Sequence, residues 1–215
     1  MRCFTPALAL VASVALSACA VVGTGDYGVE ERTVDDFDRI QVQHDVTVVL
    51  EVDPYQASRA SVDLTITGDD NLLRYVETHV VDRTLHVQTD AVLWSDLELR
   101  VTGRVAYLDA GLTLDGSRLY ASGIDGADFT IQSKDASRAM LSGNVHLLDI
   151  LAQDVARVDT LDLRARDVWV DVRDAAAVAL CATQVVSGHV DAAADVSVHC
   201  HPDTIDLNRG VDIAY

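Results

Sequence analysis

The sequence has a single lysine, Lys134, and only five of its 34 acidic residues are glutamates. Lys and Arg together number 16, so the formal net charge is −18. Nucleic acids and anionic lipid surfaces both require a basic footprint, and we therefore expect no nucleic-acid partner. Aspartate favours turns whereas glutamate favours helices, so the shortage of glutamate predicts many turns and little helix.

Long apolar runs are also missing, because no stretch reaches the roughly 20 apolar residues that a membrane-spanning helix needs. The N-terminus instead has the pattern of a secretory signal, in which Arg2 precedes a short apolar run over residues 7–16. The next residues, Leu16-Ser17-Ala18-Cys19, resemble the lipobox of bacterial lipoproteins. An ordinary signal peptide followed by an incidental cysteine is the alternative.

The lipobox reading predicts that residues 1–18 are removed and that Cys19 becomes the lipidated first residue of the mature chain. Ala20 follows, and the absence of aspartate at this position favours the outer membrane of the cell envelope. Several acyl chains together anchor a protein firmly, so the partner predicted here is the membrane itself. Residues 19–28 are glycine-rich and predict a flexible tether.

The second half of the chain contains a repeat, with successive copies 17 to 20 residues apart. Small residues and turn formers occupy one phase of this repeat, and apolar residues occupy another. The copies are Gly116-Ser117-Arg118-Leu119, Ala136-Ser137-Arg138-Ala139, Val155-Ala156-Arg157-Val158, Ala175-Ala176-Ala177-Val178, Ala193-Ala194-Asp195-Val196 and Gly210-Val211-Asp212-Ile213. A fixed period of this size is typical of a solenoid.

Aligned on the fourth residue of each copy, the repeat yields four mainly apolar columns. They are Leu119, Ala139, Val158, Val178, Val196 and Ile213; Ala121, Leu141, Thr160, Leu180, Val198 and Tyr215; Ile131, Ile150, Val170 and Ile205; and Ala152, Val172, Val190 and Leu207. Residues two apart in a strand share a side, so these columns should line one interior. Because right-handed crossovers dominate between parallel strands, the prediction is an all-β, right-handed parallel β-helix.

The predicted solenoid domain covers residues 29–215, with a group of N-terminal strands over 29–104 and regular coils over 105–215. Ile40, Val42, Val46 and Val48 alternate with polar residues and are interrupted at His44, which predicts one long strand or two placed end to end.

Aspartates recur at the corner of the repeat, at Asp115, Asp135, Asp154 and Asp174. Stacked about 4.8 Å apart, they would form a ladder of carboxylates that could hold calcium, which takes six to eight oxygen ligands. Alternatively, each aspartate simply bonds to the backbone of its own turn, and this reading is favoured. Arginines three residues further on could neutralise part of the ladder; they are Arg118, Arg138 and Arg157.

Cys181 and Cys200 lie 19 residues apart, about one repeat, and could form a disulfide between coils in an oxidising envelope. Cys181 is three residues after Val178 and Cys200 is four after Val196, so strict alternation would point them to opposite sides. Both outcomes remain open.

With these cysteines, the histidines at 189, 199 and 201 form a candidate transition-metal cluster, but they lack the paired spacing of a zinc site and predict no metal.

The first half of the chain and its end resemble the putative auto-transporter adhesin head GIN domain family. The segments that carry the resemblance are Phe37-Asp38-Arg39-Ile40-x-Val42, Leu64-Thr65-Ile66-x-Gly68-Asp69-Asp70-Asn71-Leu72-Leu73-x-Tyr75-Val76-Glu77-Thr78, Val80-x-Asp82-x-Thr84-Leu85-x-Val87 and Ile205-Asp206-Leu207-x-x-Gly210-Val211-Asp212-Ile213-x-Tyr215. The resemblance implies a secreted or lipid-anchored bacterial β-solenoid and no particular activity. The family's Ser-Gly-x-Gly corners are replaced here by Asp-Ala-Ser-Arg or Asp-Ala-Ala-Ala.

No lipase-type serine motif, zinc-protease motif or phosphate loop occurs in the sequence. The sequence therefore favours a non-catalytic, lipid-anchored envelope protein that is adhesin-like and binds a glycan or an envelope protein, or that has a structural role. No cofactor is expected. The alternative is a polysaccharide-active enzyme of the pectinase kind, which rests on the shared β-helix architecture alone.

Overall fold

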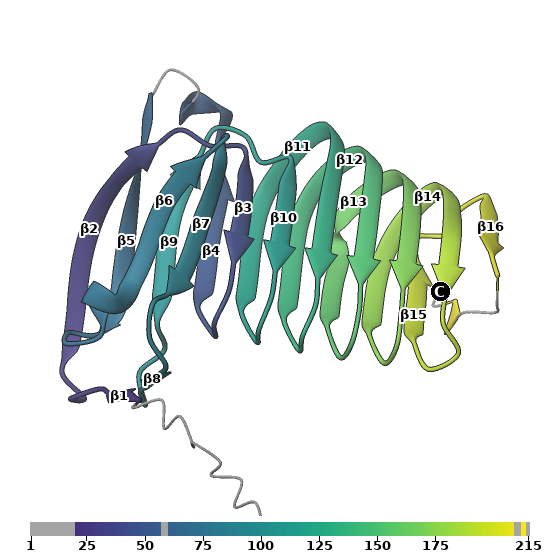
Figure 1. Cartoon of the computed structure of the whole chain (residues 1–215). Coiled ribbons are helices and arrows are strands. Elements are labelled where there is room, and N and C mark those ends of the chain that lie inside the picture. The colour runs from purple at the N-terminus through teal and green to yellow at the C-terminus, as the bar shows by residue number, and fades with distance from the viewer. Residues whose placement is uncertain (1–19, 57–59, 209–211, 214–215) are drawn as a thin grey trace, which may run out of the picture.

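The computed structural model describes residues 20–56, 60–208 and 212–213 and consists almost wholly of strands (Figure 1). The strands are β1 (Val21–Val22), β2 (Tyr27–Asp35), β3 (Arg39–Val42), β4 (Thr47–Val52), β5 (Ser61–Asp69), β6 (Val76–Val81), β7 (Thr84–Thr89), β8 (Leu93–Trp94), β9 (Arg100–Val105), β10 (Ala110–Thr113), β11 (Arg118–Ser133), β12 (Arg138–Ala152), β13 (Arg157–Val172), β14 (Ala177–Val190), β15 (Asp195–His199), β16 (Thr204–Leu207) and β17 (Asp212–Ile213). Two single 3₁₀ turns, η1 (Pro54–Gln56) and η2 (Leu73–Tyr75), complete the described elements. The predicted all-β solenoid is confirmed.

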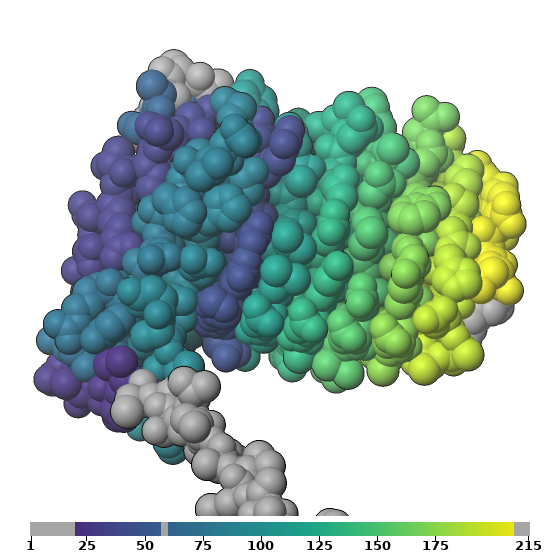
Figure 2. Space-filling view, in the orientation of Figure 1, coloured from purple at the N-terminus to yellow at the C-terminus, as the bar shows by residue number. Residues whose placement is uncertain are grey.

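The strands form two walls that enclose one interior. Face A contains the N-terminal halves of the long strands, in the order β2-β5-β9-β4-β11-β12-β13-β14-β15-β17. Face B contains their C-terminal halves, in the order β6-β7-β3-β10-β11-β12-β13-β14-β16. In Figure 1 the chain runs down face B at the front and up face A at the back while advancing to the right, which is right-handed winding. Figure 2 shows successive coils on face B as adjacent bands.

The predicted interior columns are buried and in register through most of the coils. Leu119 pairs with Ala139 and then Val158, and Ile131 pairs with Ile150 and then Val170. Every described member of these columns before residue 200 is at most 4% exposed. Apolar rows stacked in this way bury each coil against the next, which is the main source of stability in a solenoid.

The register predicted for the last coil is wrong by two residues. Ile205 pairs with Val186 and Leu207 pairs with Gly188, whereas the periodicity had placed Ile205 beside Val170 and Leu207 beside Val190. Likewise Ile213 pairs with Val198 instead of Val196. The bend between β15 and β16, which leaves the strand at Cys200 and takes up four residues outside any strand, accounts for the shift of β16, whereas Ile213 is shifted in the opposite direction along its partner strand.

An additional coil is formed by β3 and β4, far from the repeat in sequence. β3 lies between β7 and β10 on face B, and β4 lies between β9 and β11 on face A. The interruption at His44 is the turn between them, where His44 and Asp45 have φ values of 61° and 56°. Residues 39–52 are therefore inserted between β7 and β10 on face B and between β9 and β11 on face A, although they precede all four strands in the chain.

Antiparallel strands cover the N-terminal end of the solenoid. β2 pairs antiparallel with β5, and β5 pairs antiparallel with β9, while β6 and β7 form an antiparallel pair on the other face. Open solenoid ends would expose unpaired backbone groups and apolar rows, so these strands act as the cap that such folds require.

The segment predicted to be a loose tether is docked in its described part. β1 pairs in parallel with β8, the Gly25 N–H donates to Asp69 Oδ1 at 2.5 Å, and the Asn71 side chain donates to the Val22 carbonyl at 2.9 Å. The glycines that suggested flexibility permit this close approach, since a Cβ on Gly23 would lie 2.1 Å from an Asp69 carboxylate oxygen. None of the described helical turns is long and apolar enough to cross a membrane.

Candidate binding surface

The recurring aspartates sit in the turns that lead from face B to face A. Their φ values lie between 50° and 64°, in the left-handed region that aspartate tolerates better than most residues. The turns bond to each other through their backbones: the Gly116 N–H donates to the Asp135 carbonyl and the Ala175 N–H to the Asp154 carbonyl, both at 2.9 Å. The turn conformation thus accounts for aspartate here. Within the described ranges, no three His, Cys, Asp or Glu residues gather closely enough to hold a metal ion.

A row of arginines runs across face A, one strand after the next. Arg118 pairs in register with Arg138, and Arg138 pairs with Arg157. Their neighbours in each strand, Leu119 among them, are buried, so alternation directs the arginines outward. In the described part of the chain, none of the three lies within 4.0 Å of a carboxylate, so they do not neutralise the aspartate turns as the spacing had suggested.

A shallow groove of about 290 Å³ adjoins this row. Arg138 and Arg157 form one side, Met140 is 48% exposed next to them, and Ala177 and Ala179 form the floor where the following coil has only small side chains. The groove ends at Asp195 and Ser197 of the next coil, and Asp159 also lines it. A positive rim beside an apolar floor suits a ligand that carries both negative charge and apolar surface.

A larger cavity of about 940 Å³ lies at the junction of the cap, the docked N-terminal segment and the first turns. Its lining mixes apolar residues with ionisable ones, which are His44, Asp45, Asp69, Asp90, Asp96, Glu98, Asp115 and Arg118. Glu98 accepts hydrogen bonds from Arg100 and, at 2.8 Å, from the buried Thr47 hydroxyl. The hydrogen bond from Arg100 is the main reason that the pKa of Glu98 lies below its ordinary value.

Asp69 is the buried carboxylate of this cavity, at 1% exposure. It accepts hydrogen bonds from the Gly25 N–H and the Ser95 hydroxyl, so it connects the docked segment to the loop around β8. The hydrogen-bonding capacity of Asp69 is therefore used within the fold, and its role is structural. Arg118 lines the same cavity, which means that the arginine row extends from this cavity to the shallow groove.

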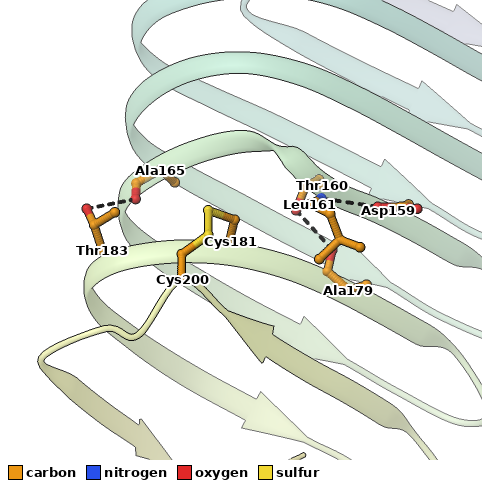
Figure 3. The surroundings of a disulfide bond; sticks show 8 residues. All are labelled: Asp159, Thr160, Leu161, Ala165, Ala179, Cys181, Thr183 and Cys200. Atoms are coloured by element: carbon orange, nitrogen blue, oxygen red, sulfur yellow. Dashed lines mark hydrogen bonds between the residues drawn. A yellow bond between two sulfur atoms is a disulfide. The ribbon is translucent and has the colours of Figure 1, made fainter. Parts of the chain in front are cut away.

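Cys181 and Cys200 form a disulfide in the structure, with a Cα–Cα distance of 5.1 Å (Figure 3). The argument from strict alternation fails at both ends of the bridge. Leu180, Cys181 and Ala182 are buried in succession at the bend of β14, and Cys200 follows β15 with a φ of 68°. The disulfide joins the bend that follows β15 to the bend within β14 in the preceding coil.

The disulfide removes both cysteine sulfurs from the candidate transition-metal cluster. Of its histidines, His189 bonds instead to Asp191, with Nε2 3.0 Å from Oδ1. Cys19, the predicted lipidation site, lies outside the described residues.

Sequence reasoning missed two parts of this surface. His44 occupies the turn position of the recurring aspartates and Asp45 that of Gly116, since Thr47 pairs with Arg118 and the Asp45 N–H donates to the Asp115 carbonyl at 3.0 Å, but this coil has no small-residue copy to reveal it. The anchoring role of Asp69 was also missed. A Gly-Asp-Asp-Asn turn signal was visible there, but its contact with residues 23–25 is 44 positions away in the chain.

Comparisons with solved structures support the fold. A crystal structure of a putative adhesin from Bacteroides fragilis superposes with a TM-score of 0.69 at 15% identity, covering 90% of this chain and 98% of that one. A putative lipid binding protein from Parabacteroides distasonis gives 0.57 at 13% identity, covering 92% and 100%. A putative adhesin from Parabacteroides merdae gives 0.57 at 14% identity, covering 91% and 99%. At these identities the likeness concerns the fold alone.

No curated protein matches the chain. Residues 36–202, however, match the family described as putative auto-transporter adhesin, head GIN domain. This range includes the β5, β6 and β7 strands of the cap, the interleaved β3–β4 coil, the arginine row and the disulfide. The resemblance seen in the sequence is confirmed, and the chain belongs to the putative auto-transporter adhesin head GIN domain family.

Proposed function

We propose that this protein is a non-catalytic, lipid-anchored protein of the bacterial cell envelope, held at the outer membrane through Cys19, and that it binds extended partners through the walls of its solenoid. Membership in an adhesin family supports a cell-surface or envelope role. The walls are built from short coils whose turns carry no long loops over residues 110–199, so they offer flat surfaces suited to long ligands.

The observation that carries the anchoring part is the docked segment directly after Cys19. β1 begins two residues beyond that cysteine and is fixed to β8 and Asn71. At about 3.3–3.6 Å per residue, a lipid on Cys19 would hold the β1–β8 pair within about 7 Å of the bilayer. Val22, Val92 and Trp94 are 62%, 60% and 69% exposed there, and tryptophan favours the membrane–water interface.

The enzyme alternative requires a concave groove with three or more clustered carboxylates beside Arg138 or Arg157. The groove next to Arg138 and Arg157 is shallow and is lined by two carboxylates, Asp159 and Asp195. A shallow groove with a largely apolar floor fits binding better than it fits bond cleavage, which needs an acid and a base directed at one enclosed site.

Metabolic labelling with a palmitate analogue in a bacterial host tests the anchor. We expect label on the wild-type chain, its recovery in the outer-membrane fraction, and loss of both in Cys19→Ala. Cys3→Ala is the matched control, since residue 3 lies in the predicted signal peptide and should not alter labelling. Equal labelling of the Cys19→Ala variant, or recovery of the wild type in the soluble periplasm, would refute the proposal.

A further inference from the structure

We infer that Arg118, Arg138 and Arg157 bind the carboxylates of an acidic polysaccharide that runs across the coils on face A. The ligand class rests on the binding function proposed above and names the kind of chain that one wall would hold. Three observations carry it: the spacing of the arginines, their lack of partners, and the surface that surrounds them.

The spacing follows from the fold. Arg118, Arg138 and Arg157 are direct register partners on three adjacent parallel strands. Neighbouring strands lie about 4.8 Å apart, so the guanidinium groups form a straight row with one positive charge per coil. A polysaccharide of uronic acids carries one carboxylate per sugar ring. Each guanidinium can bind a carboxylate through two parallel hydrogen bonds, a geometry that lysine cannot provide.

Their lack of partners is unexpected in a chain with a net charge of −18. Most of the other described arginines pair with a carboxylate, as Arg104 does with Glu51 at 2.7 Å and Arg173 with Asp171 at 2.6 Å, while Arg74 and Arg164 do not. In the row, by contrast, like charges face one another without an ion pair to any described carboxylate. Arg118 alone acts on a carboxylate at longer range, because its charge contributes, after the hydrogen bond from Arg100, to the lowered pKa of Glu98. Adjacent like charges are destabilising on a sheet, so an added anion would relieve this repulsion as well as form new contacts.

The surroundings favour a sugar chain over an acidic peptide. Tyr120 and Met140 are register partners two residues beyond Arg118 and Arg138, so they lie on the same outer side and offer an apolar strip beside these two arginines, which ends at Asp159 beside Arg157. Sugar rings present flat C–H faces that can pack on such a strip. A peptide strand would need unpaired backbone groups, but β11, β12 and β13 are each paired on both sides.

Both ends of the row are defined. On the N-terminal side the next charged position is Arg100, beyond Thr47, and it is neutralised by Glu98 at 2.5 Å. On the C-terminal side Ala177 and then Asp195 take the same position, so the positive charge ends and a negative one follows. The structure therefore assigns a site for about three acidic sugars, with the groove floor at its C-terminal end.

Binding of polygalacturonate to the chain from residue 19 onward, carrying Cys19→Ser to keep it unlipidated, tests this site by biolayer interferometry. We expect binding that weakens with salt, and a loss of about tenfold or more in the Arg118→Gln/Arg138→Gln/Arg157→Gln variant, since exposed ion pairs each contribute modestly. The matched control is Arg104→Gln/Arg166→Gln/Arg173→Gln. It removes the same three charges from elsewhere and should change the affinity less than about twofold, because distant charges are screened.

Neutral dextran and poly-L-glutamate are the comparison probes, and circular dichroism verifies that each variant is folded. Absence of polygalacturonate binding by a folded wild type overturns the inference, as does an equal loss in the control variant. Equally strong binding of poly-L-glutamate that also depends on the row would assign the site to acidic proteins and overturn the polysaccharide class. None of these results bears on palmitate labelling at Cys19, so failure here is distinguishable from failure of the anchoring proposal.

Discussion

Removal of the disulfide should destabilise the C-terminal end of the solenoid by an amount that depends on the length of the loop that the disulfide closes. The bond between Cys181 and Cys200 closes a loop with a sequence separation of 19, and loop-closure entropy for that length amounts to about 3 kcal/mol at 25 °C. For a chain of this size, each kcal/mol corresponds to roughly 2–4 °C in Tm, which gives an expected loss of about 6–12 °C. Cys181 is only 3% exposed, so a buried thiol would be left behind by reduction alone.

The experiment compares the Tm of the oxidised wild type, the wild type in reductant, and the Cys181→Ala/Cys200→Ala variant by thermal unfolding. Amide hydrogen exchange should locate the effect: β15 and β16 lose protection, whereas β11 and β12 retain it, because each coil contacts mainly its neighbours. Unfolding midpoints that agree among the three samples would refute the reasoning, and so would a uniform loss of protection along all coils.

Three further outcomes follow from single residues. Gly143 has a φ of 139°, and in Gly143→Ala the new Cβ would lie 1.9 Å from a carbonyl oxygen of the preceding coil. The free energy of unfolding in urea should therefore fall by at least about 1–3 kcal/mol. Gly126→Ala is the control and should be tolerated, because the nearest atom to its Cβ would be 3.9 Å away. Burial, and secondarily the neighbouring His79, lower the pKa of His86 below its ordinary value of 6.5. The unfolded chain is thus protonated first, so thermal stability should fall as pH drops from about 6.5 toward the lowered pKa. His86→Gln should remove this pH dependence of Tm, and a variant with the same pH profile as the wild type would contradict the argument. Asp69→Ala removes the carboxylate that holds the docked segment, so amides in β1 should exchange faster while the coils stay protected; unaltered exchange in β1 would refute its anchoring role.

The outer walls were only partly foreseeable from the sequence. The recurrence of Arg118, Arg138 and Arg157 three residues after an aspartate was visible in the repeat, and its phase is enough to put the arginines on one outer row. Whether those arginines were neutralised was not visible. Ion pairing depends on distances of a few ångströms between side chains, and the structure leaves the row without the aspartate partners that the spacing had suggested.

The sequence by itself determined the solenoid and its interior, because both follow from local periodicity. Small residues and aspartates set the turns, and alternation from Leu119 onward sets which side of each strand is buried. Stacked coils in register repeat the same contacts, so one period predicts many of them.

Only the tertiary structure decided the remaining features, because they join segments whose contacts leave no periodic trace. The insertion of residues 39–52 beside β10 and β11, the docking of β1 on β8, and the close approach of Cys181 to Cys200 are of this kind. Each depends on where the chain returns after a bend or a long excursion. At the Cys200 bend, a few residues outside the strands were enough to shift β16 by two positions and to reverse the side on which the cysteine lies.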